Sequence, residues 1–176
     1  LMLSGCPDVT PNPDPDPDPN PGPSDSSVSF QVAVQRSSDA GPEAITTALL
    51  NGDTFPDIIS ANRSSNTVSF WYSTGAGTYA AAARHVTRGE QPRSVAVDAV
   101  ATDGATAIIV ANWASDDISV IRIDAAGNRD AAVEFALPEG ASPRDVASGD
   151  LNGDGIGDIA TANEGLNSVS VFLGDG

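Results

Sequence analysis

The same landmarks return about every fifty residues from Pro42 onward. Each copy opens with a proline, carries the dipeptide Ala-Asn about twenty residues later, and then contains a short apolar segment. In the three copies the prolines are Pro42, Pro92 and Pro143, the dipeptides are Ala61-Asn62, Ala111-Asn112 and Ala162-Asn163, and the apolar segments are 67–72, 118–123 and 169–173. Because these landmarks keep one register through three copies, the sequence predicts a stack of similar structural units.

Each copy reads as short strands separated by Gly, Asn, Asp and Ser. The strands expected in the third copy are 145–149, 158–163 and 168–173, and the earlier copies add a fourth near 79–86 and 130–137. Hydrophobic residues recur at every second position in Val28–Gln35, and this segment is interpreted as the fourth strand of a blade whose other strands come from elsewhere. No window shows helical periodicity. Four strands in about fifty residues are typical of a β-propeller blade, so the predicted fold class is an all-β propeller of four-stranded blades.

The third copy contains a nonapeptide in which oxygen-bearing side chains alternate with other residues, mostly glycines. Its first, third, fifth and ninth positions are Asp150, Asn152, Asp154 and Asp158. Hard oxygen ligands around a tight turn are what Ca²⁺ requires, and the backbone carbonyl of Ile156 would be a further ligand. The loop therefore predicts a weak calcium site, with a dissociation constant of roughly 10⁻⁴–10⁻³ M as in extracellular modules. The alternative is an Asx-rich turn that needs no metal.

The corresponding loops of the other copies keep fewer of these oxygens. Leu49–Asp57 retains an Asn and two Asp residues but begins with leucine, and Ala99–Ala107 retains only Asp103-Gly104. Because the ligand set varies so freely, the expected calcium is structural and belongs to the turn between the first two strands of individual blades.

These motifs support a family resemblance. Pro143–Gly176, which includes D-L-N-G-D-G-I-G-D, resembles an FG-GAP/VCBS repeat of the integrin-α-like propellers. The resemblance covers about residues 28–176 and is specific in the third copy. The second copy, Val97–Asn112 with the segment after it, is as similar to the repeats of surface-layer and lactonase-like propellers. Both resemblances imply a propeller, and the first implies adhesion or ligand binding outside the cell.

The blades are expected near 42–91, 92–142 and 143–176, within a repeat region spanning 28–176. A closed propeller normally has four to eight blades, and the third copy stops before its fourth strand. We therefore expect a partial propeller that belongs to a longer protein. The alternative, a complete small β domain, would leave strand edges and apolar faces exposed, which natural β proteins avoid.

Residues 1–6 resemble the end of a bacterial lipoprotein signal peptide. Leu3-Ser4-Gly5-Cys6 is similar to a lipobox, which implies that the thiol of Cys6 carries diacylglycerol. The alternative is an unpaired structural cysteine. Residues 7–27 alternate Pro with Asp and Asn over much of their length, which favours an extended polyproline tether. The predicted location is the bacterial cell envelope, at the outer membrane or cell surface, with the membrane contacted only through the lipid.

Charge and motif content narrow the function. The net charge is −16, with 24 acidic residues against 8 basic ones, so a nucleic-acid partner is excluded because it needs a basic surface. There is no Gly-x-Ser-x-Gly elbow and no phosphate loop, and paired carboxylates occur only in the calcium pattern. These features favour a binding module over an enzyme, with a protein or glycan ligand outside the cell or in the periplasm. A lactonase-like or polysaccharide-acting enzyme, an accessory to one, or a surface-layer component are the alternatives.

Three residues could contribute to a ligand face. Trp113 lies in the turn after a second strand, where aromatic side chains can stack on sugars or insert into a partner. Arg93 and Arg144 each follow a blade-opening proline and could recognise an anion, or could pair with nearby Asp or Glu. Trp113 could equally pack on its own blade. The three Asn residues of the Ala-Asn dipeptides are interpreted as caps of the following turns.

Overall fold

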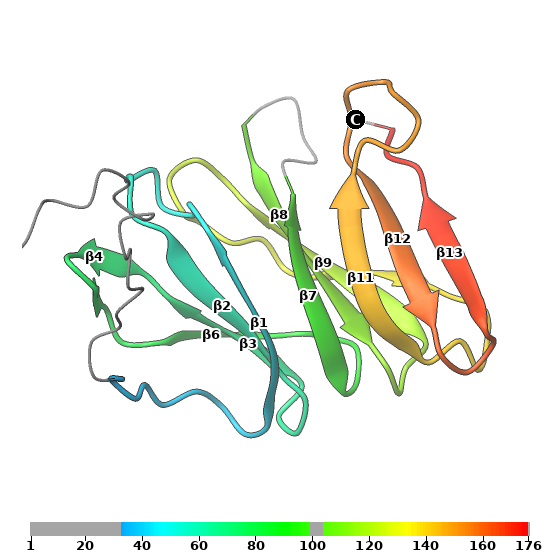
Figure 1. Ribbon diagram of the computed structural model, residues 1–176, viewed down its shortest axis with the longest axis horizontal. Coiled ribbons are helices and arrows are strands. Elements are labelled where there is room, and N and C mark those ends of the chain that lie inside the picture. The colour runs from blue at the N-terminus through cyan, green and yellow to red at the C-terminus, as the bar shows by residue number, and fades with distance from the viewer. Residues whose placement is uncertain (1–32, 99–103, 176) are drawn as a thin grey trace, which may run out of the picture. The chain divides into compact units, whose positions relative to one another are not determined.

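The computed structural model describes residues 33–98 and 104–175, and all regular structure in these ranges is β-strand (Figure 1). This confirms the predicted all-β fold class. None of the described segments is a helix that could span a membrane. The chain divides into residues 1–35 and 36–176, and each strand among the described residues lies in the second unit. Cys6, the tether at 7–27 and most of Val28–Gln35 lie outside the described residues, and the described part of that last segment, 33–35, is not strand.

Three antiparallel sheets follow one another along the chain, and we name them blades 1, 2 and 3. Blade 1 has the order β1 (Pro42–Ala48), β2 (Asp57–Asn62), β3 (Thr67–Trp71) and β6 (Ala83–Val86). Blade 2 has the order β7 (Pro92–Asp98), β8 (Thr106–Asn112), β9 (Asp117–Ile123) and β10 (Val133–Ala136). Blade 3 consists of β11 (Pro143–Gly149), β12 (Asp158–Asn163) and β13 (Ser168–Phe172). No sheet closes on itself within the described residues, as in a partial propeller.

The fourth strands are shorter than expected. Only Ala83–Val86 of the predicted 79–86 pairs with β3, and only Val133–Ala136 of 130–137 pairs with β9. In blade 1 the preceding residues form a separate hairpin of β4 (Ser73–Gly75) and β5 (Thr78–Tyr79). The two residues at its tip, Ala76 and Gly77, have φ angles of 51° and 75°, which is the left-handed conformation that tight hairpin turns require.

The blades pack face to face. Successive residues of a strand point to opposite sides, so each blade has a leading face toward the preceding blade and a trailing face toward the following one. The first interface packs the trailing face of blade 1 on the leading face of blade 2 and includes the buried residues Ile59, Ala61, Val68, Phe70, Val95, Ile108, Val110, Ile121 and Ile123. The second packs the trailing face of blade 2 on blade 3 and includes Ala107, Ile109, Ala111, Ile118, Val146, Ile159 and Phe172. Tyr72 packs against the first interface, but Trp71 lies on the opposite, leading face of blade 1.

Every blade begins with the same backbone irregularity. The residue before the opening proline has a positive φ, which is 69° at Gly41, 53° at Gln91 and 46° at Ser142. The residue after the proline is a β-bulge, because the pairing register shifts across it in all three blades. A bulge bends its strand and re-aims a side chain. The first strands lie side by side, β1 with β7 and β7 with β11, so the three bulges come close together.

The Asn residues of the Ala-Asn dipeptides are buried and brace the turn that follows. The Nδ2 group of Asn62 donates to Thr67 and Ser69, while its Oδ1 atom accepts from Ser60. Asn163 repeats this arrangement with Ser168, Ser170 and Thr161. These contacts agree with the capping interpretation. Blade 2 differs, because Val110 stands where Ser60 and Thr161 supply the donating hydroxyl in the other blades. The buried Oδ1 atom of Asn112 is therefore without a hydrogen-bond partner among the described residues.

Candidate functional site

The loop at 150–158 is closed by hydrogen bonds to its own backbone. The carboxylate of Asp150 accepts from the backbone N–H groups of Gly153, Asp154 and Gly155, at 2.6, 3.2 and 2.9 Å. Those bonds favour the charged form, so the N–H of Gly155 and then that of Gly153 lower the pKa of Asp150. Asn152 and Asp154 make further turns of the same kind, because Asn152 Oδ1 accepts from the N–H of Asp154 and Asp154 Oδ1 from that of Ile156.

The ninth residue of the loop differs from the others because it is fully buried. Asp158 has no exposed surface, and its two oxygens accept from the N–H of Leu151 at 2.7 Å and from that of Gly174 at 2.8 Å. It thus ties the start of the loop and the residues after β13 to the beginning of β12. Asp57 does the same in blade 1, with the N–H of Leu50 at 3.0 Å and that of Ser73 at 2.7 Å. The sequence pattern did not reveal this structural duty, which needs no metal.

The loop at 49–57 keeps the same shape without a carboxylate at its first position. Asn51 Oδ1 accepts from the N–H of Asp53, and Asp53 Oδ1 accepts from that of Phe55, as in blade 3. A turn of blade 2 lies against it, since the carbonyl of Ala125 is 3.0 Å from the place of a Cβ on Gly52. The hydrogen bonds of the loop therefore suffice to set its fold, while Asp150 adds charge to a loop already formed.

The donor chemistry of the blade 3 loop fits calcium, with three carboxylates and an amide oxygen in nine residues. The side chains of Asp150, Asn152 and Asp154 are exposed. Within the described part of the chain, no three carboxylate, histidine or cysteine side chains gather closely enough to hold a metal ion. The calcium site stays a prediction.

A second cluster occupies the opposite end of the strands, and we name it the end-face array. It contains the three bulge residues and the three residues that follow the Ala-Asn dipeptides, which are Glu43, Arg93, Arg144, Arg63, Trp113 and Glu164. The N–H groups of Arg63, Trp113 and Glu164 donate to the carbonyls of the positive-φ residues Gly41, Gln91 and Ser142. The repeated backbone irregularity thereby places one pair of array side chains on each blade.

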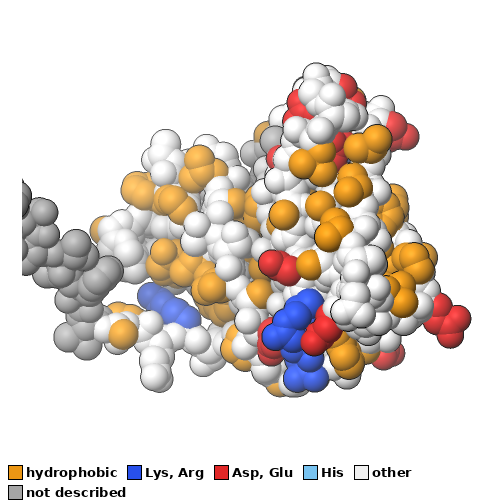
Figure 2. Space-filling view, turned by 45° about the vertical axis from the view of Figure 1, so that its right-hand side comes forward, with side chains coloured by type: hydrophobic (Ala, Val, Ile, Leu, Met, Phe, Trp, Pro, Cys, Tyr) orange, Lys and Arg blue, Asp and Glu red, His pale blue; other side chains and the backbone are white. Residues whose placement is uncertain are grey.

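The three candidate residues from the sequence are brought together in this array. The guanidinium of Arg93 lies 5.1 Å from the centre of the Trp113 ring and 3.2 Å from the carboxylate of Glu43 on blade 1. Glu164 links Trp113 to Arg144, because its Oε2 atom is 3.4 Å from the indole nitrogen of Trp113 and 3.3 Å from Arg144. Figure 2 shows basic side chains flanked by acidic ones at the lower end of the molecule.

Sequence reasoning missed Glu43, Arg63 and Glu164, although they hold the repeat positions of residues it selected. The array combines three guanidiniums, two carboxylates and one indole, so its charges largely compensate one another. Arg93 is largely enclosed, with 15% of its side chain exposed, whereas Arg144 and Glu164 remain 59% and 52% exposed. Exposed ion pairs contribute little to stability. The outer members of the array are thus free to exchange their internal partners for a ligand at small cost.

A polar cleft of about 410 Å³ adjoins the array between blades 1 and 2. It is lined by Arg63, Ser64 and Asn66 of one turn and by Glu90 and Gln91 of the connection to blade 2. Arg63 donates to the Oε1 atom of Gln91 from two nitrogens, at 3.2 and 3.0 Å. The cleft offers donors and acceptors to a polar ligand beside the aromatic surface of Trp113.

Comparison with known proteins gives one family match. The model of the FG-GAP repeat matches residues 142–172, which contain β11, β12, β13 and the loop between the first two. No curated protein matches the chain at a significant level. The fold and the match together define a β-rich chain of propeller-like blades in which blade 3 is an FG-GAP repeat. The repeat predicted in the third copy is confirmed.

The buried aspartate at the ninth loop position should stabilise its blade whether or not calcium is present. Asp57→Ala leaves two buried N–H groups unpaired and should lower the free energy of unfolding by about 2–3 kcal/mol in the presence of a chelator. Alanine fits sterically, since Ala107 occupies this position in blade 2. Urea denaturation measures the effect, with Asp53→Ala as control. Equal losses for the two variants would contradict the structural role of Asp57.

Proposed function

We propose that the protein is a binding module of the bacterial cell envelope, held by a lipid on Cys6 and extended from the membrane by residues 7–27. The FG-GAP repeat at 142–172 supports an adhesion or binding role. The resemblance of Leu3–Cys6 to a lipobox supports the anchor. The aspartates of the tether are repelled by anionic headgroups, which favours a domain held away from the membrane.

The observation that carries the proposal is the end-face array. Its backbone is fixed by hydrogen bonds that recur in every blade, while the side chains on that backbone differ from blade to blade. A rigid scaffold that presents aromatic and guanidinium groups is suited to recognition, because little conformational entropy is lost on binding. Trp113 offers a stacking surface for a sugar ring or a partner side chain, and Arg144 offers a mostly exposed donor to an anionic group.

Calcium is proposed as a structural ligand of the blade 3 loop, held by the side chains of Asp150, Asn152, Asp154 and Asp158 and the carbonyl of Ile156. Each carboxylate oxygen has a second lone pair, so Asp158 can contribute while it still accepts its backbone bonds. The role of the ion would be to neutralise the carboxylates that the open loop exposes.

The first test concerns ligand recognition. The Cys6→Ser chain would be assayed by surface plasmon resonance against a panel of acidic and neutral bacterial exopolysaccharides and envelope proteins. Trp113→Ala and Arg144→Ala should each weaken any binding by about tenfold, which corresponds to 1.4 kcal/mol. Arg84→Ala is the matched control, because Arg84 pairs with Asp39 rather than with an array residue. Binding that is lost equally in the control, or retained by both array variants, would refute this surface.

The second test concerns the metal. Millimolar calcium should raise the melting temperature of the chain, as expected for a site with a dissociation constant of roughly 10⁻⁴–10⁻³ M, and Asp154→Ala should remove most of the gain. Asp53→Ala, the equivalent change in blade 1, should leave the calcium-induced rise in melting temperature unchanged. Identical melting in calcium and in chelator would rule out the structural ion.

The third test concerns the anchor. When expressed behind a complete lipoprotein signal peptide, the chain should fractionate with membranes, and Cys6→Ser should release it, because the thiol that carries the lipid is absent. Detergent phase partitioning provides the measurement. Membrane association that persists unchanged in the variant would count against lipidation.

A further inference from the structure

The same tetrapeptide, Leu-Asn-Gly-Asp, occurs in the first loops of blades 1 and 3. It is Leu50–Asp53 in the loop between β1 and β2, and Leu151–Asp154 in the loop between β11 and β12. An asparagine side chain reacts most readily with its own backbone when glycine follows it, because glycine has no Cβ to hinder the approach of its nitrogen. Since the two tetrapeptides are identical, a difference in their reactivity must come from their surroundings in the fold.

Both asparagines are folded back over the glycine that follows them. Asn51 Oδ1 accepts from the N–H of Asp53 at 3.3 Å, and Asn152 Oδ1 accepts from that of Asp154 at 2.9 Å. The Nδ2 groups donate to the carboxylates of the same two aspartates, at 2.9 and 2.8 Å. These bonds bridge the intervening glycine and hold the side-chain amide beside the glycine nitrogen. The geometry for attack is therefore shared by the two loops.

The loops differ in what holds the N–H group of the glycine. In blade 3 the N–H of Gly153 donates to the carboxylate of Asp150 at 2.6 Å. Leu49 takes the place of Asp150 in blade 1, and the N–H of the exposed Gly52 has no hydrogen-bond partner among the described residues. Attack by the nitrogen in blade 3 would break a charge-assisted bond, and the carboxylate repels the negative charge that develops on that nitrogen. Gly52 is free of both effects.

We propose that Asn51 is a site of spontaneous deamidation and isomerisation, from which Asp150 protects the equivalent Asn152. The nitrogen of Gly52 loses its proton to base and forms a bond to Cγ of Asn51. The bond from Cγ to Nδ2 breaks, and the Nδ2 group takes up a proton and leaves as ammonia. Water then opens the resulting cyclic imide at either carbonyl, which gives aspartate or isoaspartate.

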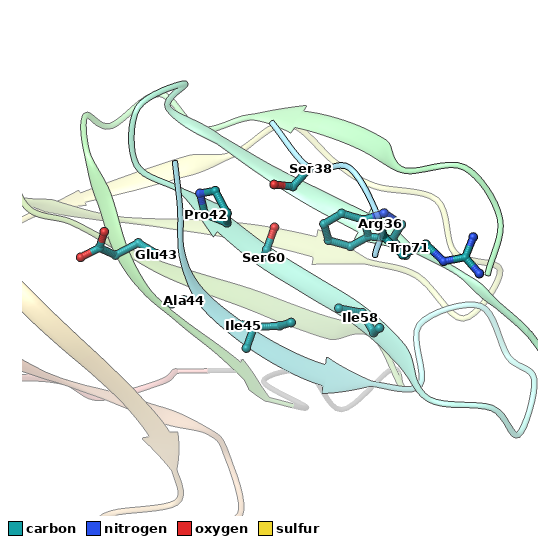
Figure 3. Close-up of a pocket in the computed structure, with 9 residues that line it drawn as sticks. All are labelled: Arg36, Ser38, Pro42, Glu43, Ala44, Ile45, Ile58, Ser60 and Trp71. Carbon is teal, nitrogen blue, oxygen red and sulfur yellow. The ribbon is translucent and has the colours of Figure 1, made fainter. Parts of the chain in front are cut away.

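The reacting residue lies against the core of the first interface. Leu50, which precedes it, is 3% exposed and belongs to that core. The Cα atom of Asn51 is 3.4 Å from the place of a Cβ on Gly127, so the loop also contacts a turn of blade 2. The loop joins β1 to β2, the strands that carry Ile45 and Ile58 in Figure 3. A change in its backbone therefore acts on the pairing of β1 with β2 and on the contact between blades 1 and 2.

Both products disturb these contacts. Each places a carboxylate where the Nδ2 group of Asn51 now donates to Asp53, so that two like charges face each other. Isoaspartate also adds a methylene group to the main chain. Modified copies should therefore melt at a lower temperature than unmodified ones.

Incubation of the Cys6→Ser chain in mildly alkaline buffer with a chelator, below its melting temperature, tests the proposal. Peptide mapping by mass spectrometry follows the loss of ammonia and the gain of water at each asparagine, and a protein isoaspartate methyltransferase labels the isoaspartate. Asn51 should react about tenfold faster than Asn152, as expected when one of them is held back by a hydrogen bond to a charged group. In concentrated urea the two rates should converge, because the tetrapeptides are identical.

Exchanging the first loop position isolates the role of the carboxylate. Leu49→Asp should slow the reaction at Asn51, and Asp150→Leu should speed the reaction at Asn152, since blade 1 already accepts leucine at this position. Val133→Asp is the control, because it adds a charge at a side chain that is 56% exposed on another blade, and it should leave both rates unchanged. Equal rates in the folded chain, a faster reaction at Asn152, or exchange variants that react as before would overturn the proposal.

Discussion

The structure depends on the burial of both faces of each sheet. Alternate residues of a strand point to opposite sides, and in blade 2 both sides are apolar, with Ile108 and Val110 on one and Ile109 and Ala111 on the other. A sheet of this kind cannot be stable by itself, because each face must be removed from water by a neighbour. Repetition follows from this requirement, since every blade supplies its neighbour with the face that the neighbour needs.

Apolar packing has little directionality, so polar contacts must set the register of the blades. Three devices recur at the strand ends: the positive-φ residue with its bulge, the buried Asn of each Ala-Asn dipeptide, and the buried Asp at the ninth loop position. Blade 2 shows that single members can be lost. It has Ala107 in place of the buried aspartate and Val110 in place of the residue that carries the hydroxyl, and its strands bury aliphatic side chains on both faces.

The fifty-residue period was enough to predict the sheets, and β12 begins and ends where the sequence placed it. Other features required the structure. The β4–β5 hairpin has only the short Gly75-Ala76-Gly77 signal, and a bulge has no distinctive residue when Glu, Arg and Arg occupy it in turn. The contact between Arg93 and Glu43 joins residues fifty positions apart, so it becomes visible only once β1 and β7 are known to be neighbours. The structural role of the buried Asp158 could not be predicted from the sequence, because Asx turns and calcium loops use the same residue types.

The two ends of the blades differ in what varies between copies, and this difference locates the proposed recognition surface. At the loop end the charged side chain of the first loop position is not kept, because Asp150 is replaced by Leu49 in blade 1 and by Ala99 in blade 2. At the array end the backbone hydrogen bond recurs in all three blades while the side chain changes from Arg63 to Trp113 to Glu164. A constant backbone with variable side chains allows recognition to change without disturbing the fold. The calcium proposed for the loop end would then stabilise one blade without taking part in the choice of ligand.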